Sequence, residues 1–333
     1  MKFGLTPLEE AEGAVLAHGV RIDGIAYKKG DVLTPERRSA LGSAGVKCVV
    51  AARLEPGDVD ENEAALKLAN RLAGAHLRCS PPFTGRVNLF ADSAGLALVE
   101  AEAIDRVNAV DEAITVATLP RCRAVADGDM VATVKIIPFA TRGETLEAAL
   151  AAAPTGTISV QPFKPMRIGV VSTTLPGLKP SIVAKTLRIL EARLKPAGGQ
   201  IVAQEIVPHE VGPLAQALAR LIDRSDALIV FGASAITDRR DVIPAAIEAI
   251  GGRIERFGMP VDPGNLLLLA ERDGTPIIGA PGCARSPKEN GFDWVLQRVL
   301  ASVPIHDSDI RAMGVGGLLM EIASRPQPRA PGD

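Results

Sequence analysis

Aromatic residues are scarce in this sequence, and neither sign of charge predominates. The chain of 333 residues contains eight Phe, one Tyr and one Trp, and its 39 acidic residues nearly balance its 37 basic ones. Proteins that bind single-stranded nucleic acid stack bases on aromatic side chains and attract phosphates with a basic surface. We therefore expect no nucleic acid as a partner, and no anionic membrane surface.

Cysteines are also few, and no two of them form a C-x-x-C pair. They stand at Cys48, Cys79, Cys122 and Cys283. This dispersed pattern predicts neither a disulfide framework nor a zinc site and is typical of reduced thiols in a cytoplasm. The start of the sequence lacks the apolar segment of a secretory signal, and the longest apolar run, residues 227–236, is about half a membrane span. A cytoplasmic protein without a membrane segment is expected.

The pattern of turns and apolar runs changes near residues 141–166. Before that point, frequent Gly- and Pro-containing turns separate short β-type runs, and helical patterns occupy residues 35–44 and 60–73. Residues 1–150 are predicted to be a mixed α+β accessory region that can divide into two subdomains. Residues 151–166 contain several prolines and are predicted to be a linker, or a strand that crosses between domains.

From residue 167 onward, strand and helix patterns alternate. Strands are predicted at residues 167–172, 201–207, 227–231, 253–257, 266–269 and 275–280, and helices at 181–195, 212–224, 241–250 and 290–302. Such alternation predicts an α/β fold with a doubly wound, mostly parallel sheet. We place this domain at residues 167–305 and regard 306–333 as a C-terminal extension or tail.

Sheets of this kind bind ligands where the carboxyl ends of strands lead into helices. The loop after the first strand offers the hydroxyls of Ser172, Thr173 and Thr174, which can hydrogen-bond a nucleotide-like ligand. His209, after the second strand, has no partner nearby in the sequence and is expected to be a surface histidine.

The loop at residues 232–241 combines small and charged residues. Gly232, Ala233 and Ser234 would let the backbone approach a ligand closely. At the end of this loop, Asp238 and Asp241 are candidates for Mg²⁺ and Arg240 for a phosphate. A helix cap is an equally good interpretation of Asp241.

The loop at residues 279–288 is the third candidate. Pro281 and Gly282 shape it, and Arg285 and Ser286 offer an anionic ligand a cation and a hydroxyl. Cys283 is most simply a small buried side chain, and a reactive or metal-coordinating role is the alternative interpretation.

These loops resemble the molybdopterin-binding proteins of molybdenum cofactor biosynthesis, over about residues 167–301. Residues 240–244 read R-D-V-I-P, as in the adenylyltransferase branch, and residues 251–282 follow the order of motifs in the molybdotransferase branch. Residues 1–150 are loosely similar to the N-terminal part of bacterial proteins that fuse a molybdopterin-binding domain to a nucleotidyltransferase. Since no Gly-rich nucleotidyltransferase signature occurs, the chain resembles the binding half alone.

The sequence departs from the family at several motifs. The family's Thr-Gly-Gly is Phe231-Gly232-Ala233 here, and its Pro-Asp-Glu is Pro208-His209-Glu210. Asp241 is the family carboxylate that is retained. The resemblance therefore implies the fold and the class of ligand more firmly than any particular reaction.

The resemblance implies a protein that binds molybdopterin, or its nucleotide- or molybdenum-loaded form, and that forms a homo-oligomer. One hypothesis adds Mg²⁺-dependent nucleotidyl or molybdenum transfer, with Asp238 and Asp241 as catalytic and metal-binding residues. Another is a non-catalytic carrier that serves a partner nucleotidyltransferase or molybdoenzyme. A third is a protein like the nicotinamide nucleotide amidohydrolases, although their G-L-G-P-T loop is not found.

The implied ligand-binding residues are Ser172, Thr173, Thr174, Gly232, Ala233, Ser234, Arg240, Pro281, Gly282, Cys283, Arg285 and Ser286.

Overall fold

A computed structural model describes residues 1–22 and 25–319 of the chain. Contacts divide it into two compact units: unit 1 comprises Met1–Ser93 and Ala97–Gln161, and unit 2 comprises Ala94–Leu96 and the chain from Pro162 onward. None of the helices in the described part is both long enough and apolar enough to cross a membrane.

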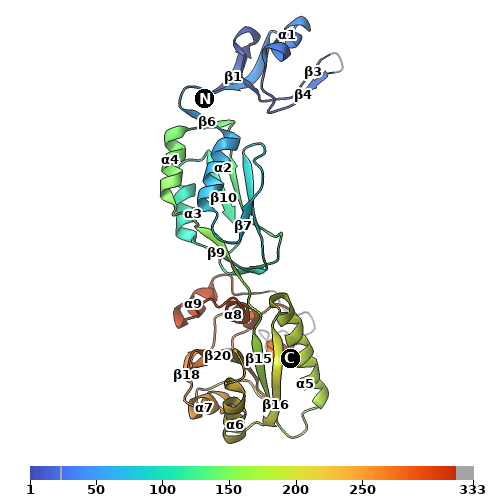
Figure 1. Ribbon diagram of the computed structural model, residues 1–333, viewed down its shortest axis with the longest axis vertical. Helices are drawn as coiled ribbons and strands as arrows, with labels where there is room; N and C mark the ends of the chain where they lie inside the picture. Colours follow the sequence, from blue (N-terminus) through green and yellow to red (C-terminus); the bar gives the residue numbers. More distant parts are fainter. Residues whose placement is uncertain (23–24, 320–333) are drawn as a thin grey trace, which may run out of the picture. The chain divides into compact units, whose positions relative to one another are not determined.

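The first part of the chain is mixed α+β, as the sequence predicts (Figure 1). Its helices are η1 (Leu8–Glu10), α1 (Pro35–Ser43), α2 (Glu61–Leu72), α3 (Ala101–Asn108) and α4 (Gly143–Ala152). Its strands are β1 (Lys2–Pro7), β2 (Val15–Leu16), β3 (Val20–Ile22), β4 (Ile25–Tyr27), β5 (Cys48–Arg53), β6 (Asp58–Asp60), β7 (Leu77–Cys79), β8 (Arg86–Ala91), β9 (Gly95–Val99), β10 (Ile114–Thr118), β11 (Arg123–Val125), β12 (Met130–Ile136), β13 (Ala140–Arg142) and β14 (Ile158–Pro162).

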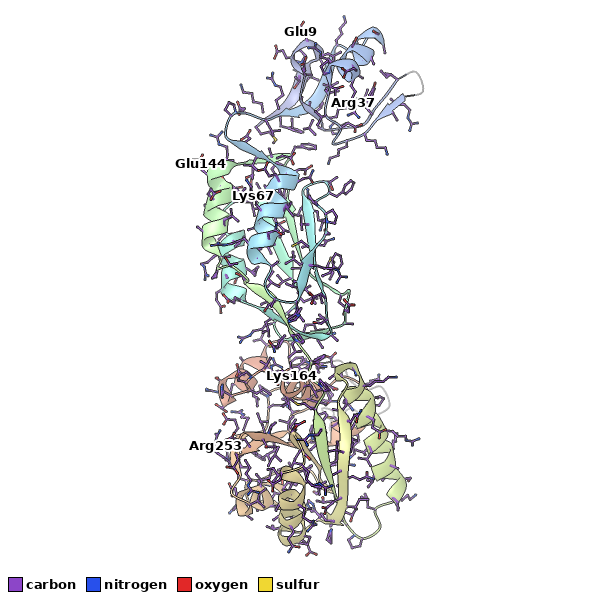
Figure 2. All side chains as sticks on the ribbon, in the orientation of Figure 1. Glu9, Arg37, Lys67, Glu144, Lys164 and Arg253 are labelled. Carbon is purple, nitrogen blue, oxygen red and sulfur yellow. The ribbon has the colours of Figure 1, made fainter. Side chains whose placement is uncertain are left out.

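These strands form several small sheets over two separate hydrophobic clusters. One cluster surrounds Leu16 and Leu41 near the N-terminus, and the other surrounds Leu68 of α2. Charged side chains such as Lys67 project from the surface of this unit (Figure 2). Within the range predicted to be a linker, residues 158–162 instead form β14, which joins β9 and β11 in one sheet.

Unit 2 is built on a six-stranded sheet in the order β16-β15-β17-β20-β19-β18. The strands are β15 (Arg167–Thr174), β16 (Gln200–Pro208), β17 (Ala227–Phe231), β18 (Arg253–Phe257), β19 (Leu268–Arg272) and β20 (Thr275–Ala280). The first four strands in the sheet order are parallel, whereas β19 is antiparallel to both of its neighbours. The prediction of a mostly parallel α/β sheet is confirmed.

Helices cover both faces of this sheet (Figure 1). The helices of unit 2 are α5 (Pro180–Leu194), η2 (Lys195–Ala197), α6 (Val211–Ile222), α7 (Val242–Ala249), η3 (Gly282–Arg285), α8 (Gly291–Leu300), α9 (Asp307–Arg311) and η4 (Ala312–Gly314). Apolar residues of α5 and α8 pack on one face, and those of α6 and α7 on the other. All five residues of β17 are buried, because this central strand is covered on both sides.

Two details of unit 2 differ from the sequence analysis. The strand predicted at residues 266–269 begins two residues later as β19, because the Leu267 amide donates to the Gly264 carbonyl in the preceding turn. The predicted tail also contributes to the core, since Ile310 of α9 is buried in the cluster with α5 and α8. The remainder of that tail, residues 320–333, lies outside the described residues.

Candidate functional site

The parallel register brings the three candidate loops to one edge of the sheet. Ser172 near the end of β15 lies beside Phe231, the last residue of β17, and Phe231 in turn lies beside Ala280, the last residue of β20. The loops that follow these strands therefore begin side by side, although more than 100 residues of sequence separate the first from the last.

One peptide group connects all three loops. The Gly232 carbonyl accepts a 2.8 Å hydrogen bond from Arg285 Nη2, and the amide of the next residue, Ala233, donates to Thr173 Oγ1 at 2.8 Å. This 232–233 peptide requires glycine at its first residue, because a Cβ on Gly232 would lie 2.6 Å from the Ser234 carbonyl oxygen. The small residues of this loop thus allow close packing within the protein itself.

Thr173 also contacts His209. The Thr173 side chain is buried, and its Oγ1 lies 2.8 Å from His209 Nδ1. The His209 amide donates to the Thr174 carbonyl at 2.9 Å. The sequence shows no local partner for His209, because the partner lies 36 residues earlier and becomes a neighbour only through the pairing of β15 with β16; the histidine is partly buried and not simply a surface residue.

Arg285 is a half-buried cation at this edge. Its Nη1 donates to Thr186 Oγ1 of α5 at 3.1 Å, and its guanidinium carbon lies 5.5 Å from the centre of the Phe231 ring. Burial lowers the pKa of Arg285, and no carboxylate between residues 25 and 319 forms an ion pair with it. A guanidinium has five N–H groups and here only two have partners, so an anion could be bound without breaking either bond.

The loop that carries Arg285 is held by a second arginine. Arg193 of α5 donates to the carbonyl oxygens of Ala284 and Ser286 at 2.9 and 2.7 Å and forms an ion pair with Asp293 of α8. The side chains of Arg193 and Asp293 are only 10% and 12% exposed. Sequence reasoning missed both Arg193 and Thr186, because each lies on a helix and has its partners in a loop about 100 residues away.

Three of the four charged residues of the second loop are engaged with one another or with the backbone, and the fourth, Arg239, is exposed. Asp241 caps α7 by accepting a 2.7 Å hydrogen bond from the Val242 amide, which confirms the capping interpretation. Arg240 forms a 2.8 Å ion pair with Asp238, and this contact lowers the pKa of Asp238. Across the described ranges, no three His, Cys, Asp or Glu side chains are grouped so as to hold a metal ion.

The remaining predicted residues differ in how accessible they are. Ser172 and Cys283 are buried, and Cys283 Sγ lies 3.6 Å from Asn290 Oδ1. Ser234 and Gly282 are exposed, whereas Ser286 Oγ accepts a hydrogen bond from the Lys288 amide within its own turn. Pro281 precedes η3 as a buried residue. Of these residues, Ser234 and Gly282 are the ones that a ligand can reach most readily.

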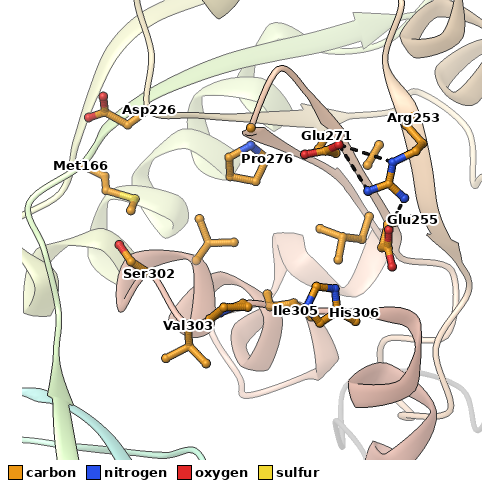
Figure 3. A pocket seen from close by; sticks show the side chains of 15 residues that line it. Met166, Asp226, Arg253, Glu255, Glu271, Pro276, Ser302, Val303, Ile305 and His306 are labelled. Carbon is orange, nitrogen blue, oxygen red and sulfur yellow. Dashed lines mark hydrogen bonds and ion pairs between the residues drawn. The ribbon is translucent and has the colours of Figure 1, made fainter.

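A cavity of about 370 Å³ lies at the opposite edge of the sheet, beside the amino ends of the parallel strands (Figure 3). Met166 and Asp226 line it where β15 and β17 begin. Arg253 also lines it but pairs with Glu255 and Glu271, so its charge is already balanced. With an excess of carboxylates over cations, this cavity is unsuited to a phosphate.

Comparison with known proteins gives one match of a family model. Residues 168–302 match the model of a probable molybdopterin binding domain. Similar solved structures include a molybdopterin biosynthesis MoeA protein from Pyrococcus horikoshii, 18% identical, with 76% of this chain and 78% of that chain covered and a TM-score of 0.32. The MoaB molybdopterin biosynthesis enzyme from Thermus thermophilus is 17% identical, with 42% of this chain and 98% of that chain covered and a TM-score of 0.28. No curated protein gives a significant match.

Proposed function

We propose that Arg285 binds the phosphate of molybdopterin at the edge where the loops after β15, β17 and β20 meet, on the premise that residues 168–302, which match the model of a probable molybdopterin binding domain, bind this ligand. The ligand class comes from the family, and the position comes from the arrangement of unit 2.

The observation that carries this proposal is the unpaired charge of Arg285. Arg193, Arg240 and Arg253 of unit 2 each pair with a carboxylate. Arg285 instead donates to two neutral oxygens and lies over an aromatic ring. A half-buried cation without a counter-charge is stabilised by an incoming anion, and hydrogen bonds between charged groups are about twice as strong as neutral ones.

Backbone groups of the second loop support the same position. The amides of Ser234 and Ala235 donate to no acceptor within residues 25–319, although the Ala233 amide just before them is engaged. Free amides in a loop that leads into a helix suit phosphate oxygens. We assign Thr174, Ala233, Ser234 and Gly282 to the wall of the site beside Arg285.

Two kinds of chemistry fit this site. In the first, Asp241 and Asp238 would hold Mg²⁺ beside the ligand's phosphate, and the ion would supply positive charge for transfer of a nucleotide or of molybdenum. Mg²⁺ commonly binds through one or two carboxylates plus substrate phosphates. In the second, the domain carries the pterin to a nucleotidyltransferase or molybdoenzyme without reacting. The ion pair of Asp238 with Arg240 favours the carrier, because it occupies one of the two carboxylates.

The proposal is tested with a phosphate monoester of 6-hydroxymethylpterin and with the unphosphorylated pterin as its matched control. Titration followed by pterin fluorescence should show at least tenfold tighter binding of the phosphate ester. Equal affinities would remove the role assigned to Arg285, and no binding of either pterin would overturn the proposed function. Incubation of the full chain with molybdopterin, ATP or CTP and Mg²⁺ then separates transfer from carriage, because a carrier binds without turnover.

Asp241→Asn separates the metal role from the cap. Asn caps helices about as well as Asp, so we expect the free energy of unfolding to change by less than about 0.5 kcal/mol. If Asp241 holds Mg²⁺, the ion tightens ligand binding to the wild-type protein and has no effect on the variant. A Mg²⁺ effect of the same size in both proteins would limit Asp241 to capping α7. Calorimetric titration with and without Mg²⁺ measures the difference.

A further inference from the structure

The buried hydroxyl of Thr173 fixes the state of the His209 ring. Thr173 Oγ1 can donate one hydrogen bond and accept two. It accepts one from the Ala233 amide, and its other partner among the described residues is His209 Nδ1. A buried hydroxyl proton without an acceptor costs about 1–3 kcal/mol, so the Thr173 hydroxyl is expected to donate to Nδ1. His209 is then the neutral tautomer that carries its proton on Nε2.

The Nε2–H group of this tautomer is an unused donor. It has no acceptor among residues 25–319, and the His209 ring is only partly buried. The ring lies beside the carboxyl end of β15 and, through Thr173, is connected to the 232–233 peptide whose carbonyl is held by Arg285. His209 and Arg285 thus flank the same peptide, and both retain N–H groups that can serve a ligand.

We propose that His209 binds the ligand directly, by donating a hydrogen bond from Nε2–H to a phosphate oxygen. This inference rests on the proposed function, since it assigns a second contact to the phosphate that Arg285 binds. A neutral donor adds a directed hydrogen bond on the β16 side of the edge, whereas Arg285 supplies the charge on the β20 side. Together they would discriminate a phosphorylated pterin from an unphosphorylated one.

The tautomer is tested first, by long-range ¹H–¹⁵N NMR spectra of the histidine rings in the full chain. We expect the His209 signals of an unprotonated Nδ1 and a protonated Nε2, assigned by comparison with His209→Asn. A proton on Nδ1 of the neutral ring would overturn the inference, because Nε2 could then not donate. This measurement requires no ligand and is therefore independent of the proposed function.

Binding is tested with two substitutions whose side-chain amides replace different nitrogen atoms of the His209 ring. The amide of His209→Asn can occupy the position of Nδ1 and retain the bond to Thr173, whereas His209→Gln reaches the position of Nε2. With the phosphate ester of 6-hydroxymethylpterin, we expect His209→Asn to lose about tenfold in affinity and His209→Gln to recover part of that loss. Neither variant should change the affinity for the unphosphorylated pterin.

The matched control is His18→Asn, because His18 is an exposed histidine in unit 1. It should bind the phosphate ester as tightly as the wild-type protein. If the wild-type protein and His209→Asn bind the phosphate ester equally well, His209 does not contact the ligand. The inference is then wrong, while the proposed function is unaffected. If His209→Asn weakens both pterins equally, the residue acts through the loop and not on the phosphate, which also overturns the inference. If the wild-type protein binds neither pterin, it is the proposed function that fails.

Discussion

Arg285→Met should weaken binding of the phosphorylated pterin by about ten- to a hundredfold. A hydrogen bond to a charged group contributes about 1.5–3 kcal/mol, and each 1.4 kcal/mol corresponds to tenfold in affinity. Met retains the apolar contact with the Phe231 ring but loses the charge and the donors to Gly232 and Thr186. The affinity of Arg285→Lys should lie between those of the wild-type protein and Arg285→Met, because lysine keeps the charge but lacks the planar guanidinium group.

Arg253→Met is the control for this prediction, because Arg253 is a surface arginine of the same unit at the opposite edge of the sheet. It should bind the phosphorylated pterin like the wild-type protein, and fluorescence titration measures all three variants. If Arg253→Met no longer binds the phosphorylated pterin and Arg285→Met binds it normally, the anion site lies in the cavity of Figure 3 and not beside Arg285.

Arg193→Met should lower the free energy of unfolding of unit 2 by about 3–5 kcal/mol. The substitution leaves Asp293 as a nearly buried charge without its partner, and breaking such a pair costs about that much. For a domain of this size, the midpoint of thermal unfolding should fall by roughly 10 °C. Trp294 of α8 is the single tryptophan of the chain, so its fluorescence reports unfolding of unit 2.

Arg167→Met provides the comparison, since Arg167 pairs with Asp226 in the same unit but both side chains are well exposed. Exposed pairs contribute about 0–1 kcal/mol, so urea unfolding of this variant should differ little from that of the wild-type protein. Equal losses in the two variants would show that the Arg193–Asp293 pair is no more important than a surface contact. The Arg193 variant should also bind the pterin more weakly, because Arg193 holds the loop that carries Arg285.

The sequence predicts unit 2 well because its signals are local. Apolar strands such as β17 alternate with helices of clear periodicity, and that alternation leaves few arrangements other than a doubly wound sheet. Unit 1 is harder, because many of its strands have only two or three residues and such runs carry almost no periodicity. The strand β14 lies inside a segment with several prolines, which is typical of a linker as well as of a strand at the edge of a sheet.

The candidate site could be located from the sequence but its contacts could not. The rule that loops after parallel strands share one edge was enough to select Thr173, Gly232 and Arg285. The partners of His209 and Arg193 depend on strand order and on a loop about 100 residues away, which no local pattern encodes. For Asp241, the contact with the Val242 amide establishes the helix cap, whereas the Mg²⁺ role is a proposal.

The 232–233 peptide has a consequence for how its neighbours respond to one another. A peptide group is conjugated, so a hydrogen bond at the carbonyl oxygen polarises the group and strengthens the donor at its nitrogen. The bond from Arg285 to Gly232 and the bond from Ala233 to Thr173 therefore reinforce each other. The effects of substituting Arg285 and Thr173 on stability should therefore be non-additive. A ligand that weakens the bond from Arg285 to Gly232 should also weaken the hydrogen bond that the Thr173 hydroxyl, beside His209, accepts from Ala233.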